Sequence, residues 1–327
     1  MGQGSTLWLK ALAEHESNWG WRNYWRENRL AACVPDNPDS AAAIETHWTG
    51  FFSELPAGKR VLDIATGNGV LLAWAARAAR AVRRELTLTG IDLADIDPAR
   101  FLPEYQIDLA AARFVGNTAA ESLPFADGSF DVVVSQYGLE YADIELALSE
   151  SARVLAAGGQ LHWLAHGVDS IVVAQGRAQL VDIDLLLASD GPFAAMKSYI
   201  GARVRGRKVS RATRVLTEAL RSAEAYCAAN PPATLVQQLC GGILDTANQF
   251  EKYHPADTER WVVENLKRLR GQRQRTRDLL SARLSGDRFA QVEQALGAAP
   301  WSDAVISSLN VGAAGDSVGQ LFHAVRL

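Results

Sequence analysis

Cysteine is scarce in this chain, and long apolar runs are missing. The 327 residues include three cysteines, which stand far apart at Cys33, Cys227 and Cys240. This spacing fits neither a zinc motif nor a framework of disulfide bonds, so we expect free thiols in a reducing, cytoplasmic setting. No segment approaches the roughly 18 consecutive apolar residues that a membrane-spanning helix needs. The sequence therefore predicts a protein with no membrane span and no metal site.

A strong net charge of either sign is also missing. Lys and Arg number 33 and Asp and Glu number 37, which gives a net charge of -4. This balance provides no global electrostatic attraction for nucleic acid or for an anionic membrane. Residues 203–214 and 267–277 form basic runs, which we interpret as solvated helix faces, the usual structure of such runs. Nucleic acid is therefore disfavoured as a partner.

The chain has enough apolar material for a large hydrophobic core. Hydrophobic residues make up 48% of it, and nine of its residues are Trp. A chain of this length can bury one sizeable core and an appended subdomain. We divide it into a helical, Trp-rich lead-in (residues 1–55), a core of strands and helices (56–168), a helical insertion (169–300) and a closing β-hairpin (301–327).

The most informative segment is RVLDIATGNGV, residues 60–70. Its apolar first half predicts a buried strand, ATGNG predicts a tight turn, and residues 70–79 predict a helix that begins at once. Gly67 and Gly69 allow the backbone to pass close to a ligand, and the amides at the start of the helix can meet a carboxylate or a phosphate. The segment therefore predicts a site for a nucleoside-type ligand.

A second strand adds an acid to this site. Residues 86–91 are apolar and end in Asp92. An acid at the end of the second strand is placed to accept hydrogen bonds from both hydroxyls of a ribose, although Asp95 and Asp97 are competing candidates. Further elements are predicted at residues 132–134 (strand), 143–155 (helix) and 160–165 (strand), and residues 304–309 and 320–327 predict a terminal antiparallel pair.

Four motifs in the proper order resemble the core of class I S-adenosylmethionine-dependent methyltransferases, of the methyltransferase-11 and quinone-methyltransferase type: LDIATGNG, GID, AAESLPFADGSFDVVVSQ and ARVLAAGGQLHWLAH. The resemblance covers residues 61–166 and implies an α/β fold with a Rossmann-like, doubly wound, seven-stranded sheet that ends in an antiparallel hairpin. The family usually has a glycine where this chain has Ala65, and an Asp where it has Ala119. The Pro-Pro motif of amino-methylating nucleic-acid enzymes is replaced by SQYG.

The resemblance implies S-adenosylmethionine as the cofactor and assigns residues to its parts. Asp63 is expected to position the methionine end, with capping of the turn as its alternative role. Asp92 is expected at the ribose. Ala120 and Glu121 are expected along the adenine, with Leu93 on its other face. The turn and the end of the fourth strand complete the expected site: Ala65, Gly67, Asn68, Gly69, Ser135 and Gln136.

Catalytic residues are harder to read, because the sulfonium of this cofactor is already a good methyl donor. Alignment of the acceptor can supply about 7 to 11 kcal/mol in favourable cases. A general base helps if the acceptor is a hydroxyl, and His166 and Glu140 are candidates for it, with His254 a weaker one. Tyr137 is expected in the same pocket. His162 lies inside a predicted strand and is expected in the core.

Two further segments bear on the pocket. Trp21 and Trp25 stand four residues apart on one face of a predicted helix. They are either an aromatic lid over the cofactor or anchors that hold this helix to the core. The insertion stands where the family usually has one short helix, so we expect it to cover the carboxyl edge of the sheet, where ligands bind.

These patterns predict an enzyme that transfers methyl from S-adenosylmethionine to O, N or C of a small, aromatic or quinone-like metabolite. One alternative is an RNA or protein methyltransferase that uses the basic insertion. Another is a non-catalytic module that binds the cofactor or a partner. The acceptor and the oligomeric state stay open at this point, a homodimer included.

Overall fold

The computed structural model describes residues 20–26, 38–312 and 315–327. These residues form two compact units. One contains the described residues up to 175 and those from 278 onward, and the other contains residues 176–277. We expected an insertion over residues 169–300. The compact helical unit starts and ends inside that range, and the remaining residues of the range group with the core. Cys33 lies outside the described residues, while Cys227 and Cys240 are free thiols.

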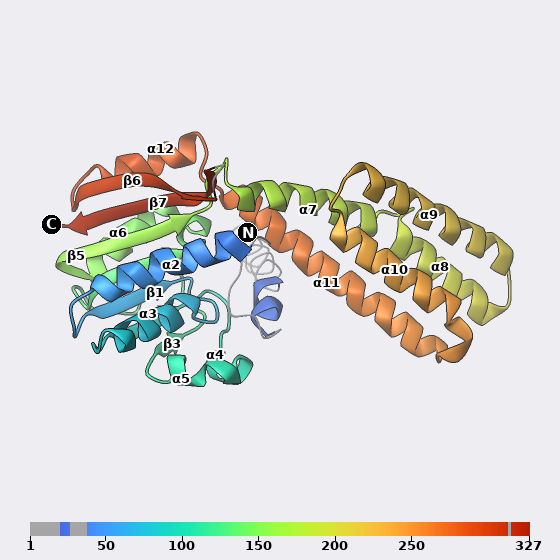
Figure 1. Ribbon diagram of the computed structural model, residues 1–327, viewed down its shortest axis with the longest axis horizontal. Helices are drawn as coiled ribbons and strands as arrows, with labels where there is room; N and C mark the ends of the chain where they lie inside the picture. The colour runs from blue at the N-terminus through green and yellow to red at the C-terminus, as the bar shows by residue number, and fades with distance from the viewer. Residues whose placement is uncertain (1–19, 27–37, 313–314) are drawn as a thin grey trace, which may run out of the picture. The chain divides into compact units, whose positions relative to one another are not determined.

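The first unit is built on a seven-stranded sheet in the order β3-β2-β1-β4-β5-β7-β6 (Figure 1). The five strands β1 to β5 run parallel, and β7 is antiparallel to both β5 and β6. The predicted doubly wound sheet with a terminal antiparallel hairpin is therefore confirmed. The strands are β1 (Arg60–Ile64), β2 (Thr87–Ile91), β3 (Arg113–Val115), β4 (Phe130–Gln136), β5 (Leu155–Ala165), β6 (Trp301–Val311) and β7 (Asp316–Arg326).

Helices cover both faces of this sheet because its central strands are apolar on both sides. Val61, Val132 and Val134 pack in one cluster with the helices α2 and α3, whereas Leu62 and Val133 pack in another with α6 and α12. The helices of this unit are α2 (Pro38–Glu54), α3 (Val70–Ala81), α4 (Pro98–Phe101), α5 (Gln106–Leu109), α6 (Ile144–Val154) and α12 (Asp287–Leu296), with short 3-10 turns η1 (Pro103–Tyr105) and η2 (Leu139–Tyr141).

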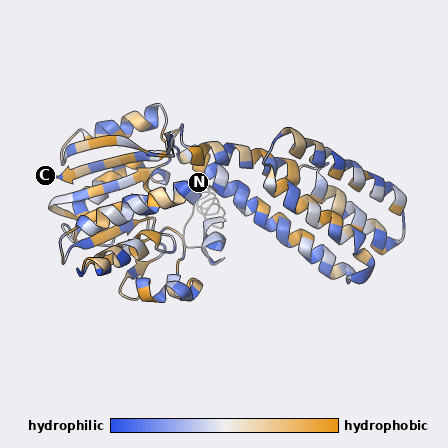
Figure 2. Cartoon of the chain, viewed as in Figure 1, coloured by the Kyte–Doolittle hydropathy of each residue, from blue (hydrophilic) through white to orange (hydrophobic). Residues whose placement is uncertain are grey.

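The second unit is helical. It contains α8 (Pro192–Arg205), α9 (Val209–Ala229), α10 (Thr234–Asn248) and η3 (Phe250–Lys252), together with most of α7 (Ile171–Leu187) and α11 (Pro255–Ala282). Its helices alternate hydrophilic and hydrophobic residues (Figure 2), and the apolar ones form a core of their own. No described helix is long and apolar enough to cross a membrane. The prediction that the insertion covers the carboxyl edge of the sheet stays a prediction.

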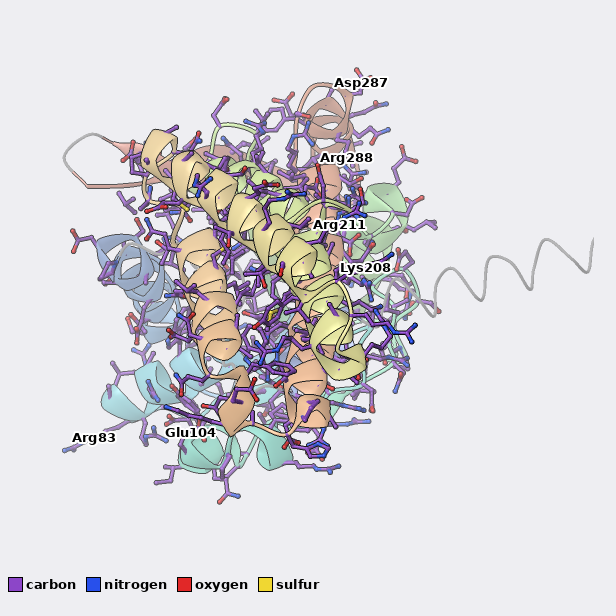
Figure 3. All side chains as sticks on the ribbon, turned by 90° about the vertical axis from the view of Figure 1, so that its right-hand side faces the viewer. Arg83, Glu104, Lys208, Arg211, Asp287 and Arg288 are labelled. Atoms are coloured by element: carbon purple, nitrogen blue, oxygen red, sulfur yellow. The ribbon has the colours of Figure 1, made fainter. Side chains whose placement is uncertain are left out.

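The two basic runs lie in this helical unit, and several of their arginines have acidic partners. Arg203 pairs with Glu251, Arg214 lies 3.8 Å from Glu218, and Arg273 lies 2.6 Å from Asp184. Lys208 and Arg211, by contrast, are exposed at the start of α9 (Figure 3).

Three histidines meet on the face of the sheet that α2 covers. His47 of α2 and His162 of β5 place their Nε2 atoms 2.9 Å apart, and His162 pairs across the sheet with His323 of β7. The ring of His162 also stacks on Phe51, with 4.2 Å between the ring centroids. Burial, and then the neighbouring imidazoles, lower the pKa of His162 to about 3. His162 is thus a core residue, as its place inside a strand predicts.

This cluster predicts that the protein loses stability in mild acid. Because the folded pKa of His162 lies below the unfolded value of 6.5, the unfolded chain binds the proton first as the pH falls. The stability from neutral His162 is present above pH ~6.5 and decreases below it, by about 2 kcal/mol near pH 5. Burial also lowers the pKa of His47 and His323, which adds to the effect.

Urea unfolding at a series of pH values checks this prediction. His162→Gln is expected to flatten the decline between pH ~7 and ~5, and the exposed His254→Gln is the matched control that keeps it. An equal decline in wild type and His162→Gln would contradict the prediction.

Candidate functional site

A cavity of about 380 Å³ opens at the carboxyl ends of β1, β2 and β4, all within the first unit. Parallel strands bring the loops that follow them to one edge, which is why segments far apart in the sequence meet there. Eight of the residues predicted for the site line this cavity: Ala65, Asp92, Leu93, Ala120, Glu121, Gln136, Tyr137 and Glu140. Six others do not line it: Asp63, Gly67, Asn68, Gly69, Ser135 and His166.

Asp92 is the acid that both lines the cavity and organises the glycine turn. Its carboxylate accepts hydrogen bonds from the backbone N–H of Gly67 at 2.8 Å and of Ala94 at 2.7 Å. Burial raises its pKa to about 6, although these hydrogen bonds favour the charged form and oppose the increase. Asp92 therefore links the turn after β1 to the turn after β2.

Asp63 lies beneath the turn. Its Oδ2 accepts the hydroxyl of Thr66 at 2.6 Å, and its Oδ1 is buried with no hydrogen-bond partner among the described residues. Burial raises the pKa of Asp63 to about 8, and the nearby charge of Asp92 raises it further. The contact with Thr66 matches the capping alternative, and the unpaired oxygen leaves an acceptor for a further donor.

The glycines of the turn make room for aromatic rings of this same chain. A Cβ on Gly67 would lie 2.4 Å from the ring of Trp25, and a Cβ on Gly69 would lie 2.8 Å from the ring of Phe114. Both glycines also have positive φ angles, 54° and 85°. The side chain of Asn68 donates to the backbone carbonyl of Trp25 at 2.8 Å. Helical residues 20–25 thus pack directly on the glycine turn.

Ala65 stands in the left-handed region, with a φ of 58°, a conformation that costs energy for any residue with a Cβ. This cost explains why glycine is usual at this place in the family. A partner position accommodates the alanine, because a Cβ on Gly138 would lie 2.4 Å from the Cβ of Ala65. The need for glycine at 138 was not visible from the sequence.

The end of β4 supplies a polar residue that faces the cavity and another that does not. Gln136 lines the cavity, and its Oε1 is buried without a hydrogen-bond partner among the described residues. Ser135, by contrast, is fully buried, donates to the carbonyl of Ile64 and accepts the backbone N–H of Leu139. Its side chain holds η2 in place.

The candidate bases Glu140 and His166 form one pair. Glu140 Oε1 lies 2.6 Å from His166 Nδ1 and accepts the backbone N–H of His166 at 2.9 Å, while Oε2 accepts the indole N–H of Trp163 at 3.1 Å. Both side chains are fully buried, and Glu140 is the member that reaches the cavity wall. Tyr137 stacks on His166, with 4.5 Å between the centroids, and its hydroxyl donates to the carbonyl of Val318.

Aromatic rings form another part of the wall. Trp21 stacks with Trp25 and meets the ring of Tyr141 edge-on, with centroids 6.1 and 5.9 Å apart. All three side chains line the cavity. Of the two alternatives for Trp21 and Trp25, the contact with the glycine turn matches the anchor, and their place in the wall matches the lid.

The segment that follows the helical unit of residues 176–277 contributes residues that sequence reasoning missed. Asp278 and Ser281 of α11 and Arg288 of α12 line the same cavity. The chain returns to the sheet here, where Leu284 N–H donates to the carbonyl of His166 at 2.7 Å. No local motif marks these residues, because their role depends on where the chain re-enters the core.

Comparisons with known proteins match the strand-and-helix core. Residues 62–163 match the family described as "Methyltransferase domain". The demethylmenaquinone methyltransferase of Thermus thermophilus is 38% identical over 106 residues, which are 32% of this chain and 46% of that protein. A ubiquinone/menaquinone biosynthesis C-methyltransferase of Chromobacterium violaceum is 37% identical over 117 residues, 35% of this chain and 46% of that protein. The chain thus spans about half the length of these curated relatives.

A solved structure, the PH0226 protein from Pyrococcus horikoshii, is 20% identical and covers 45% of this chain and 63% of its own, with a TM-score of 0.33. A score of this size establishes no common overall fold. The family match therefore concerns the core, and the sheet topology described above stands on the structure itself.

Gly67→Ala is expected to destabilise the protein by about 1 to 3 kcal/mol, because the new methyl group overlaps the ring of Trp25 and adopts a positive φ. Trp25→Ala removes the overlap but not the strain in φ. The double variant is therefore expected to be more stable than the sum of the single effects predicts, by about 1 kcal/mol. Urea unfolding of the four proteins measures this coupling, and strictly additive effects would show that the two residues do not touch.

Proposed function

We propose that the protein transfers a methyl group from S-adenosylmethionine to a small, aromatic or quinone-like acceptor, a proposal supported by the match of residues 62–163 to the methyltransferase domain family. The observation that carries the proposal is the cavity itself. Its wall contains a buried acid, Asp92, at the end of the second strand, and Glu140, which is paired with the buried His166.

The residues present fit this cofactor. Asp92 accepts two backbone N–H groups and still has lone pairs for ribose hydroxyls. The unpaired Oε1 of Gln136 is an acceptor for the ammonium group of the methionine end, and the unpaired Oδ1 of Asp63 lies below the same turn. Leu93 and Ala120 are apolar residues of the wall on which an adenine can pack. When bound, the cofactor supplies an electrophilic methyl group.

The chain's own contribution to the chemistry is to orient the acceptor and to remove its proton. We assign the proton to the Glu140–His166 pair, because Glu140 lies in the wall and His166 is hydrogen bonded to it. The oxygens of Glu140 already accept N–H groups from Trp163 and from the backbone of His166, and the His166 tautomer with its proton on Nδ1 donates to the same carboxylate. The sequence alone left these two residues as separate candidates.

The shape of the wall favours a planar acceptor. Trp21 and Tyr141 meet edge-on and present aromatic surface to the cavity, and such surface packs well against another ring. The matched relatives in Thermus thermophilus and Chromobacterium violaceum are named as demethylmenaquinone and ubiquinone/menaquinone methyltransferases. An aromatic or quinone-like acceptor for this chain is consistent with both, and a cytoplasmic location is part of the same proposal.

The first test is binding of S-adenosylhomocysteine, measured by titration calorimetry with NAD as the control. Asp92→Ala is expected to weaken this binding by about 1 to 3 kcal/mol, through loss of charged hydrogen bonds. The ribose binds the ionised form of Asp92, whose pKa is about 6 in the free protein. Affinity is therefore expected to fall as the pH drops below about 6. Unchanged affinity of folded Asp92→Ala would remove Asp92 from the site.

Variants of the buried pair separate catalysis from cofactor binding. Glu140→Gln and His166→Asn are each expected to lower kcat by on the order of 100-fold, because neither variant can take up the acceptor's proton as the pair does. Affinity for S-adenosylhomocysteine is expected to stay within about twofold, and His254→Asn, an exposed histidine, is the control. The measurement is transfer of labelled methyl to a panel of quinols and phenols. Wild-type kcat in both variants would remove the pair from the reaction.

A further inference from the structure

Arg288 brings a positive charge to a cavity that is otherwise acidic. It is the second residue of α12, half-buried, and Figure 3 marks it beside the exposed Asp287 that begins the helix. Among the described residues that line the cavity, Arg288 is the one Lys or Arg, and the lining also contains four acids from different parts of the chain: Asp92, Glu121, Glu140 and Asp278.

The guanidinium is held in place without being neutralised. Its Nη2 donates to the backbone carbonyl of Glu140 at 2.6 Å, and this is a neutral acceptor. Its Nε is buried with no hydrogen-bond partner, and no ion pair among the described residues includes Arg288. A buried N–H donor without an acceptor costs free energy, and an anionic ligand in the cavity would accept from it.

Glu140 connects this cation to the proposed proton acceptor. The carbonyl of Glu140 binds Arg288, and its carboxylate binds His166. A ligand oxygen that reaches Arg288 therefore lies near the pair that takes the acceptor's proton. The aromatic side chain of Tyr141, the next residue, lines the cavity at the same place.

We infer that Arg288 binds an oxyanion carried by the aromatic ring of the methyl acceptor, either a ring carboxylate or an ionised ring hydroxyl. The inference rests on the proposed function and narrows its substrate class to acceptors that are acidic. An arginine suits this task because its guanidinium stays charged at every relevant pH and offers several N–H donors in one plane.

The cofactor also has a carboxylate, at its methionine end, and the surroundings of Arg288 favour the acceptor over it. The groups proposed for the methionine end, Gln136 and Asp63, lie at the ends of β4 and β1. Arg288 instead contacts η2 beyond β4, beside Tyr141 and the Glu140–His166 pair. This is the part of the cavity that we assign to the acceptor.

The experiment measures binding of simple aromatic probes to protein saturated with S-adenosylhomocysteine. Benzoate and benzamide have the same shape and differ in charge, so their affinity ratio reports on the carboxylate. 4-Nitrophenol reports on an ionised hydroxyl, because its phenolate absorbs visible light and the pKa of the bound probe can be read from the spectrum. Wild type is expected to bind benzoate about tenfold or more tightly than benzamide, or to lower the pKa of bound 4-nitrophenol.

Arg288→Gln is expected to abolish whichever preference wild type shows, and Arg288→Lys to retain part of it because the charge remains. Arg283→Gln is the matched control. Arg283 is also half-buried and also donates to a backbone carbonyl, that of Leu280, but it does not line the cavity.

Three results would overturn the inference. The first is wild-type protein that binds S-adenosylhomocysteine but shows neither preference, and the second is Arg288→Gln that keeps the wild-type preference. The third is Arg288→Gln that weakens binding of S-adenosylhomocysteine but not of methylthioadenosine, which lacks the carboxylate, and leaves the aromatic probes unaffected. Arg288 would then bind the cofactor. Wild type that fails to bind S-adenosylhomocysteine at all would instead defeat the proposed function, and the inference with it.

Discussion

A fully buried carboxylate must be hydrogen bonded, and the site depends on how Glu140 meets this requirement. Its carboxylate oxygens accept N–H donors from Trp163, near the end of β5, and from His166, just beyond β5. Its backbone carbonyl accepts a hydrogen bond from Arg288 of α12. A single residue in a three-residue 3-10 turn thereby connects β4, β5 and α12. Removal of any of these partners leaves a polar group buried without compensation.

The glycine turn obeys a related constraint. Two carboxylates, Asp63 and Asp92, contact residues of the turn, and burial raises the pKa of each. Backbone N–H groups and the hydroxyl of Thr66 offset part of the cost, and this ties the turn to the ends of β1 and β2. A site organised in this way is largely formed before a ligand arrives, so a ligand with hydroxyl and ammonium donors completes hydrogen bonding that the protein leaves unfinished.

The helical unit of residues 176–277 is stabilised by a hydrophobic core that is separate from the core of the sheet. Its core is its own, formed by apolar faces of α7 to α11 such as Phe193, Met196 and Ile243. The chain leaves the sheet after β5 and returns to it between α11 and α12, where the backbone N–H of Leu284 donates to the carbonyl of His166; Arg288 of α12 then lines the cavity. An insertion placed between two strands can in this way add residues to a site through the segment that follows it.

Local pattern was sufficient to locate six of the seven strands of the sheet, and β3 (Arg113–Val115) was not predicted. The apolar run before Asp63, the acid at 92 and the alternation near the C-terminal end of the chain predicted β1, β2, β6 and β7 to within a few residues. The largest boundary difference is in β5, which begins at Leu155 and not at residue 160; Leu155 already pairs with Phe130 of β4. Pairing across a sheet extends a strand through residues whose own propensity predicts a turn.

The sequence by itself determined the class of the core, because a strand, a glycine turn and a helix follow one another within about a dozen residues, and such short-range order needs no tertiary information. Tertiary structure alone decided that Glu140 and His166 form a pair, that Trp25 covers Gly67, and that Gly138 makes room for Ala65. Arg288 belongs to the same group, since 148 residues separate it from the Glu140 carbonyl that holds it. Contacts between residues so far apart in the sequence depend on the order of the strands and on where the chain rejoins the sheet. The local periodicity of a sequence predicts neither of these.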